Sequence, residues 1–273
     1  CNIIKQMNNT DDYLSVNKSL WDKRLNEHLN SEFYDLSGFI AGKTSLNKIE
    51  LDILGNIEGK SVLHLQCHFG QDSISLSKMG ANVTAMDFSQ KSIDKAIELS
   101  RELGTSTRFV CCDLYELDQY LDEQFDLVFT SYGTITWLPN LDRWAHIVNT
   151  FLKPGGRFVF VEFHPVIWMY DDDLHDVVYH YNNVEPIEEQ EEGTYANPDA
   201  NIKHTNITWN HGTSEVIGSL LAKGLQLDSF LEYYYSPYPF VRHTEEFEPG
   251  KFRIRHFGNK VPLVYSLEMY KHV

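Results

Sequence analysis

The sequence lacks any apolar run that approaches the ~18 residues of a membrane-spanning helix. No membrane partner is therefore expected. Positive charge is also scarce, because 23 lysine and arginine residues stand against 39 aspartate and glutamate residues, for a formal net charge of -16. A strongly acidic surface repels the phosphate backbone of nucleic acids, so DNA and RNA are not expected as partners either.

Cysteine is scarce as well, with four in 273 residues. Cys1, Cys67, Cys111 and Cys112 show neither the spacing of a zinc site nor that of a disulfide framework, so no metal is predicted. Reduced cysteines in an enzyme-like chain predict a cytoplasmic location. Cys1 is an unusual first residue, and two origins stay open: a cloning remnant, or removal of a leader, including that of a lipoprotein. Nothing in the sequence indicates an oligomeric state.

The chain has no internal repeat and no low-complexity linker, and its length is enough to bury a full core. A single domain over residues 1–273 is therefore predicted. Residues 1–55 are expected to form an N-terminal helical arm. Residues 165–210 are rich in acidic and aromatic residues and are predicted as an inserted lid or small antiparallel sheet, with a disordered linker as the alternative. Residues 236–260 are predicted as an aromatic-rich loop or lid.

From residue 61 onward, short apolar strands alternate with helical stretches. Strands are predicted at 61–66, 82–86, 107–112, 125–130 and 157–163. This alternation is typical of βαβ units and a parallel sheet. Right-handed crossovers place the carboxyl ends of such strands at one edge, where ligands of open α/β sheets bind. The residues expected at that edge are Gly70, Asp87, Asp113, Ser131 and His164.

Glycine is missing where a dinucleotide-binding turn needs it. The turn after the first strand reads Gln66-Cys67-His68-Phe69-Gly70, with one glycine in place of G-x-G-x-x-G. Close approach of a pyrophosphate is disfavoured, which argues against NAD or FAD. A nucleoside ligand without that group fits better, since Asp87 is placed to accept hydrogen bonds from ribose hydroxyls and Asp113 from an adenine amine. A turn-capping role is the alternative for each aspartate.

Residues 61–163 resemble the class I S-adenosylmethionine-dependent methyltransferases. The resemblance rests on residues 62–70, 83–89, 112–114, 125–128 and the Leu-Lys-Pro-Gly-Gly element at 152–156. It implies an α/β fold with a Rossmann-like open sheet of seven strands, mostly parallel with an antiparallel last strand, helices on both faces and an insertion after the fifth strand. Residues 225–234 and 261–270 would supply the last two strands.

The first turn departs from the usual family pattern. The family usually carries an acidic residue where His64 stands and glycines where Gln66 and His68 stand. A subgroup of bacterial small-molecule methyltransferases is similar in carrying the Leu-His-Leu-Gln-Cys-His turn and a Trp-Asn-His opening of the late helix, here Trp209-Asn210-His211. A variant site rather than an inactive one is expected.

The resemblance implies S-adenosylmethionine as the cofactor and assigns its contacts. Its methionine half would lie beside the turn, its sulfonium near Ser131, its ribose near Asp87 and its adenine near Phe88, Asp113 and Leu114. Trp21 or Tyr34 would close over the methionine end, with core packing as the alternative. The implied cofactor-binding residues are Gln66, Cys67, His68, Gly70, Asp87, Phe88, Asp113, Leu114 and Ser131.

Methyl transfer from a sulfonium is an in-line displacement at an activated carbon, so orientation supplies much of the rate. A general base is needed only when the acceptor must lose a proton. His164 and His211 are the catalytic candidates, and Glu162 is a weaker one. The predicted function is methyl transfer to a small-molecule acceptor. The alternatives are a nicotinamide-dependent oxidoreductase on a Rossmann sheet and a non-catalytic methyltransferase-like binding module.

Overall fold

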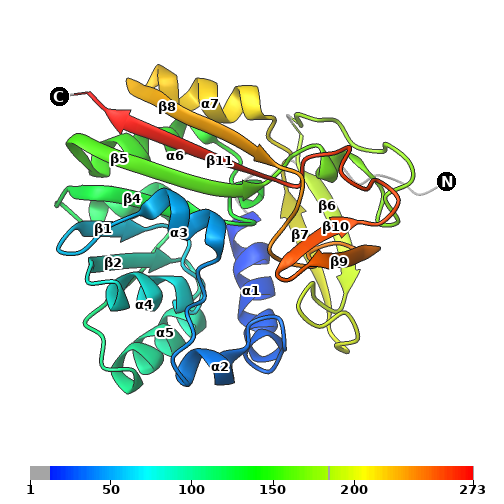
Figure 1. Ribbon diagram of the computed structural model, residues 1–273, viewed down its shortest axis with the longest axis horizontal. Coiled ribbons are helices and arrows are strands. Elements are labelled where there is room, and N and C mark those ends of the chain that lie inside the picture. Colours follow the sequence, from blue (N-terminus) through cyan, green and yellow to red (C-terminus); the bar gives the residue numbers. More distant parts are fainter. Residues whose placement is uncertain (1–12, 184, 273) are drawn as a thin grey trace.

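The computed structural model describes residues 13–183 and 185–272 (Figure 1). Cys1 and the first part of the expected N-terminal arm lie outside the described residues. The helices are α1 (Tyr13–Leu29), α2 (Leu36–Ile40), α3 (Lys48–Leu54), α4 (Gln71–Lys78), α5 (Gln90–Glu102), α6 (Leu141–Phe151) and α7 (Thr213–Ala222). Short 3-10 helices lie at η1 (Leu114–Gln119), η2 (Ile135–Trp137) and η3 (Ile167–Met169).

A seven-stranded sheet forms the centre of the described residues, in the order β3-β2-β1-β4-β5-β11-β8. Its first five strands pair in parallel, and β11 pairs antiparallel with both β5 and β8. The predicted Rossmann-like sheet with an antiparallel last strand is confirmed. Its strands are β1 (Ser61–His64), β2 (Asn82–Asp87), β3 (Arg108–Cys111), β4 (Phe125–Ser131), β5 (Leu152–Phe163), β8 (Leu225–Tyr233) and β11 (Val264–Lys271).

Helices cover both faces of the sheet, which is why its central strands are apolar on both sides. In β5, residues 158–161 are completely buried. One face packs against η1, α6 and α7 in a core that includes Trp144, Phe158 and Phe160. The other packs against α3, α4 and α5 around Val159, Val161 and Ile93. Among the described residues, no helix is long and apolar enough to cross a bilayer.

Two hairpins lie outside the main sheet. One pairs β6 (Ile187–Glu192) with β7 (Lys203–Thr208), and the other pairs β9 (Thr244–Glu248) with β10 (Lys251–Ile254). Figure 1 shows both hairpins and α1 at the side of the sheet where the parallel strands end. The insertion after the fifth strand thus contains an ordered antiparallel pair, and the segment 236–260 contains a hairpin within its loops.

Polar side chains of α1, among them Asn17 and Arg24, hold the β6–β7 hairpin against that helix. The Asn17 side chain donates to the backbone carbonyl of Ile207 at 2.8 Å and accepts from its amide at 3.0 Å, in the manner of a neighbouring strand. The Arg24 guanidinium pairs with Glu191 at 2.6 Å. These contacts join segments that are 190 and 167 residues apart and enclose the space above the strand ends.

Candidate active site

A cavity of about 910 Å³ lies at the carboxyl ends of the parallel strands. Its floor comes from the residues that follow β1, β2 and β4, and its walls come from α1, from residues 163–174 and from the β6–β7 hairpin. Residues 238–242, which precede β9, complete it. The sequence-predicted residues that line this cavity are Gln66, Cys67, His68, Gly70, Asp87, Phe88 and Ser131, together with Trp21 and Tyr34 of the N-terminal arm.

The turn after β1 has an unusual backbone. Gln66 has φ 54°, His68 has φ 51° and Gly70 has φ 81°, all in the left-handed region that favours glycine. This explains why glycine is usual at the first two positions. In this chain, side chains hold the strained turn instead: the Gln66 amide donates to the Thr134 carbonyl at 3.0 Å, and the His68 backbone amide donates to Asp87 Oδ2 at 2.9 Å.

The His68 ring fastens the turn to the helices on either side. Its Nε2 lies 2.9 Å from Nδ1 of His28 on α1, and its Nδ1 lies 3.2 Å from the Ser92 hydroxyl on α5. Burial lowers the pKa of His68 to about 3 and that of His28 to about 2. Both rings are therefore neutral at pH 7, so that one can donate to the other. Trp21 contacts the His68 ring edge-on, with ring centroids 5.1 Å apart.

Asp87 stands at the end of β2 with both carboxylate oxygens engaged. Oδ2 accepts from the His68 amide and Oδ1 from the Ser89 amide, each at 2.9 Å. Burial raises the pKa of this carboxyl to about 6. Because a carboxylate oxygen can accept more than one hydrogen bond, Asp87 keeps acceptor capacity for a diol in the cavity that it lines.

Asp113 and Leu114 lie beyond the cavity lining, one strand further out. The Asp113 carboxylate accepts from the Tyr115 amide at 3.1 Å and so caps η1, which is the alternative role weighed for it above. Leu114, the first residue of η1, is buried in the core that also contains Leu141, Trp144 and Ala145 of α6. The residue preceding Asp113, Cys112, donates its amide to the Asp87 carbonyl, so Asp113 and Leu114 follow closely on the end of β2. Neither of them lines the cavity.

Polar groups gather where β4 ends. The Ser131 hydroxyl donates to Asp72 Oδ2 at 3.2 Å, and both residues line the cavity. His64 replaces the family's usual acidic residue, and its Nδ1 lies 2.7 Å from the Ser73 hydroxyl. Burial lowers the pKa of His64 to about 4, so this ring is neutral. Asp72, from the first turn of α4, supplies a carboxylate in the vicinity.

The two catalytic candidates are not brought to the cavity. His164 Nε2 lies 2.9 Å from Glu232 on β8, and its Nδ1 accepts from the Val166 amide. His211 Nε2 lies 2.7 Å from the Leu138 carbonyl, and its Nδ1 lies 3.1 Å from Glu215. Neither residue is among those that line the cavity. The position of His164 at a strand end and of His211 before a helix start does not bring either ring to the cavity, because both rings turn toward other partners.

Glu162 is also occupied, but with the loop that follows β4. Its carboxylate is 2% exposed and accepts from the amides of Gly133, Thr134, Ile135 and Phe163, and from the Thr134 hydroxyl. Burial raises the pKa of this carboxyl, while the amides oppose that shift. Because most of these hydrogen bonds come from residues 133–135, the Glu162 carboxylate holds the loop after β4, which carries Tyr132 and Thr134, in place.

Two features of the cavity were missed in the sequence. Arg24 on α1 is 4% exposed, lines the cavity, and its Nε has no hydrogen-bond partner within residues 13–183 and 185–272. The Tyr132 hydroxyl, at the end of β4, donates to Glu50 Oε2 on α3 at 3.0 Å. The three-residue spacing of Trp21 and Arg24 along one helix could have indicated the first feature. The second joins distant segments, so no local pattern marks it.

Metal-binding geometry is absent from the described part of the chain, where no group of three or more His, Cys, Asp or Glu side chains could hold an ion. Cys67, Cys111 and Cys112 are free thiols. Burial raises the pKa of the Cys67 thiol, which lines the cavity, so its thiolate form is disfavoured.

Comparisons with known proteins agree with this geometry. A methyltransferase domain model matches residues 62–156, the segment that contains the β1 turn, Asp87 and the loop after β4. This match identifies residues 62–156 as a methyltransferase domain. An uncharacterized methyltransferase of Synechocystis sp. is 30% identical to this chain over 133 residues, which cover 48% of this chain and 60% of that protein. A ubiquinone biosynthesis O-methyltransferase of Chromobacterium violaceum is 29% identical over 153 residues, which cover 55% and 60%.

This chain therefore matches about 60% of the length of these curated relatives. Solved structures extend the likeness of fold over most of the chain. An S-adenosylmethionine-dependent methyltransferase of Clostridium acetobutylicum has a TM-score of 0.56 at 16% identity, over 93% of this chain and 97% of that one. The DhpI–SAH complex has a TM-score of 0.55 at 19% identity, over 97% and 99%.

Proposed function

We propose that this protein transfers the methyl group of S-adenosylmethionine to a small organic acceptor. The observation that carries the proposal is the cavity at the carboxyl ends of β1, β2 and β4. Most of the residues that the sequence assigned to the cofactor line this cavity, and so does a wall of aromatic and acidic side chains. Such a concave, mostly apolar site with a few placed polar groups suits a small molecule. When bound, S-adenosylmethionine supplies an electrophilic methyl group on a positively charged sulfur.

The residues present fit a nucleoside cofactor without a pyrophosphate. The backbone at Gln66, Cys67, His68 and Gly70 would flank the methionine half, Asp87 would accept from the ribose hydroxyls, and Phe88 would pack on the adenine. Ser131 would lie near the sulfonium. The contacts of Asp87 support its role, since its two amide donors hold the carboxylate in place at the cavity wall.

Arg24 extends this assignment to the N-terminal arm. A buried guanidinium whose Nε has no partner within the described residues is costly unless an acceptor reaches it. We propose that the carboxylate of the cofactor's methionine half is that acceptor, and that Trp21, which contacts both Arg24 and His68, closes over the same end. The arm and the segment 165–210 would then be parts of one methyltransferase domain, the first over the cofactor and the second over the acceptor.

Tyr132 and Glu50 are the proton acceptors that we propose in place of His164 and His211. Tyr132 lines the cavity directly after Ser131, and its hydroxyl bonds to the buried Glu50 carboxylate. Burial, reinforced by Asp72, raises the pKa of Glu50 to about 7. At neutral pH such a pair can take a proton from the methyl-accepting substrate: the phenol oxygen of Tyr132 receives it while the hydroxyl passes its own proton to Glu50. An acceptor that loses no proton would need only orientation. We further propose a cytoplasmic location, which the free thiols support.

Calorimetric titration tests the proposal directly. S-adenosylhomocysteine and S-adenosylmethionine should bind with one site per chain, and NADH should not. Asp87→Ala should weaken binding by roughly 1.5–3 kcal/mol, because hydrogen bonds to a charged acceptor are lost. Asp113→Ala serves as the comparison, since its carboxylate caps η1 outside the cavity. Absence of binding by both sulfur ligands, in protein shown to carry neither, would refute the methyltransferase assignment.

A further inference from the structure

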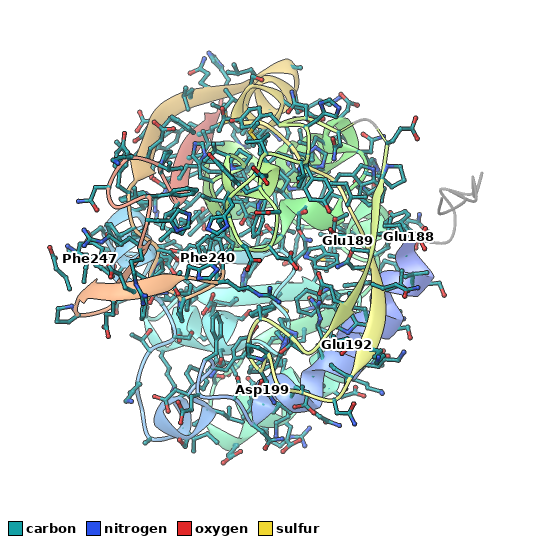
Figure 2. The ribbon with its side chains drawn as sticks, turned by 90° about the vertical axis from the view of Figure 1, so that its right-hand side faces the viewer. Glu188, Glu189, Glu192, Asp199, Phe240 and Phe247 are labelled. Carbon is teal, nitrogen blue, oxygen red and sulfur yellow. The ribbon has the colours of Figure 1, made fainter. Side chains whose placement is uncertain are left out.

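The inner face of the β6–β7 hairpin presents hydrogen-bond acceptors to the cavity. Glu189 on β6 stands directly across from Asn206 on β7, and both line the cavity. Cross-strand partners place their side chains on the same face within about 5 Å of one another at Cβ. Figure 2 shows Glu188 and Glu189 on opposite sides of β6, with Glu189 toward the interior.

Asn206 has an acceptor that no group in the described residues satisfies. The residue is 3% exposed, and its Oδ1 has no hydrogen-bond partner among residues 13–183 and 185–272. Its Nδ2 donates to Glu191 Oε1 at 2.6 Å. The Glu191 carboxylate thereby fixes the orientation of the amide, because a flipped amide would turn its oxygen toward an anion. A buried carbonyl oxygen without a donor calls for a ligand that brings one.

Glu189 adds a negative charge beside that oxygen. Its Oε1 accepts from the Tyr179 hydroxyl, and burial, with Glu191 and Asp172 nearby, raises the pKa of its carboxyl. The neighbouring guanidinium of Arg24 is already paired with Glu191. Arg242, the other arginine that lines the cavity, is mostly exposed and faces Asp173. Eight carboxylates line the cavity with these two arginines: Asp35, Asp72, Asp87, Asp171, Asp172, Glu189, Glu191 and Glu192.

An aromatic wall completes the acceptor side of the cavity. Phe163 and Phe240 stack with ring centroids 3.9 Å apart, and Trp168 contacts Phe240 edge-on at 5.8 Å. All three line the cavity, and Phe240 is labelled in Figure 2. Aromatic rings attract ammonium groups at their faces, and they also bury apolar surface. The wall therefore suits the body of a molecule whose charged end reaches the hairpin.

We propose that Glu189 and Asn206 form a binding site for an ammonium group of the methyl acceptor, so that the substrate is an amine with an apolar or aromatic body. The proposal rests on the proposed function and deepens it. The ammonium is a recognition group: its N–H bonds reach Glu189 and the Asn206 carbonyl, and the site excludes anionic acceptors of the same shape. The cofactor's own ammonium is the competing occupant, because Arg24, proposed to hold the methionine carboxylate, pairs with Glu191 beside Asn206; a loss of S-adenosylhomocysteine affinity in the Glu189 or Asn206 variants would assign the site to the cofactor instead.

Matched probes test this assignment with the full chain saturated with S-adenosylhomocysteine. We would titrate amines with different bodies (2-phenylethylamine, n-hexylamine and tryptamine) against their carboxylate and alcohol counterparts. At least one amine should bind about tenfold or more tightly than both of its counterparts. Glu189→Gln and Asn206→Ala should each weaken that amine about tenfold or more while the affinity for S-adenosylhomocysteine is unchanged.

Glu188→Gln is the control, because Glu188 lies on the exposed face of the same strand and should bind the amine as the wild type does. Failure of every amine to bind, or equal binding of a carboxylate counterpart, would overturn the ammonium site. So would a Glu189→Gln variant with unchanged amine affinity. If S-adenosylhomocysteine itself does not bind, the proposed function fails, and the same amine titrations on the protein alone still decide whether the ammonium site exists.

Discussion

Replacing Gly70 by alanine should destabilise the protein through a contact that can be isolated. Gly70 ends the turn after β1 at φ 81°, where a side chain is strained. An added Cβ would lie 2.8 Å from Ala96 Cβ on α5 and 2.9 Å from Cε1 of Phe109 on β3. The Ala96 methyl is bonded directly to the backbone of α5, so no side-chain rotation can move it away. Gly70 is thus needed for the close approach of the turn to α5 as well as for its backbone conformation.

The two effects have separable magnitudes. A non-glycine residue in the left-handed region costs about 1–2 kcal/mol. Overpacking of a rigid neighbour costs typically about 1–3 kcal/mol more. Gly70→Ala should therefore lower the free energy of unfolding by roughly 2–5 kcal/mol. Gly104→Ala is the matched control, because Gly104 has φ 67° and, among the described residues, an added Cβ there meets nothing within 4 Å. It should show the backbone term alone.

Urea unfolding followed by circular dichroism measures both variants. Glycine inside a helix itself costs about 0.5–1 kcal/mol, so the double variant is compared with Ala96→Gly alone: Gly70→Ala should cost less in that background than in the wild type, because the nearest clash is gone while the strained backbone remains. Titration with S-adenosylhomocysteine should show weaker binding for Gly70→Ala and unchanged binding for Gly104→Ala. Equal stability losses at the two glycines, with no smaller cost of Gly70→Ala in the Ala96→Gly background, would refute the argument that close packing requires Gly70.

Four further predictions concern the cavity and its supports. Burial raises the pKa of Glu50 from 4.5 to about 7, so the stability that its protonated form contributes below pH 4.5 is lost as the pH rises through about 7. Glu50→Gln should remove this loss of roughly 3 kcal/mol. The idea is contradicted if the free energies of unfolding of the variant and of the wild type change in the same way from pH 5 to 8. The same variant and Tyr132→Phe should lose the rise in methyl-transfer rate near pH 7. Glu162→Gln places the NH2 of a carboxamide, which is itself a donor, against the amide donors of Gly133 and Thr134. It should cost about 3 kcal/mol in urea unfolding, and an unchanged midpoint would show that the loop after β4 does not depend on the carboxylate. His164→Gln and His211→Gln should lower the melting temperature and keep turnover, whereas a ~10²–10⁴-fold rate loss at full stability would restore histidine as the base.

The sequence by itself determined the sheet and the cofactor-side edge. Strand and helix periodicity is a local property, so the alternation from residue 61 onward was enough to predict parallel βαβ units and to place Asp87 and Ser131 at one edge. The resemblance then accounted for the antiparallel β11. Even the departures at Gln66 and His68 were visible, although only the backbone angles show that both residues keep the left-handed conformation for which glycine is usual.

Only the tertiary structure decided which side chains meet above that edge. Arg24 and Glu191 are 167 residues apart, and Tyr132 and Glu50 are 82 apart, so neither pair leaves a local pattern. The same reason explains the histidines: a residue's place at a strand end is set by the chain's periodicity, but the direction of its ring depends on partners from other elements. His211 turns to the Leu138 carbonyl, which lies 73 residues away in the sequence. The cavity wall formed by α1 and the β6–β7 hairpin depends on such long-range contacts, because the hairpin inserted after β5 packs against α1.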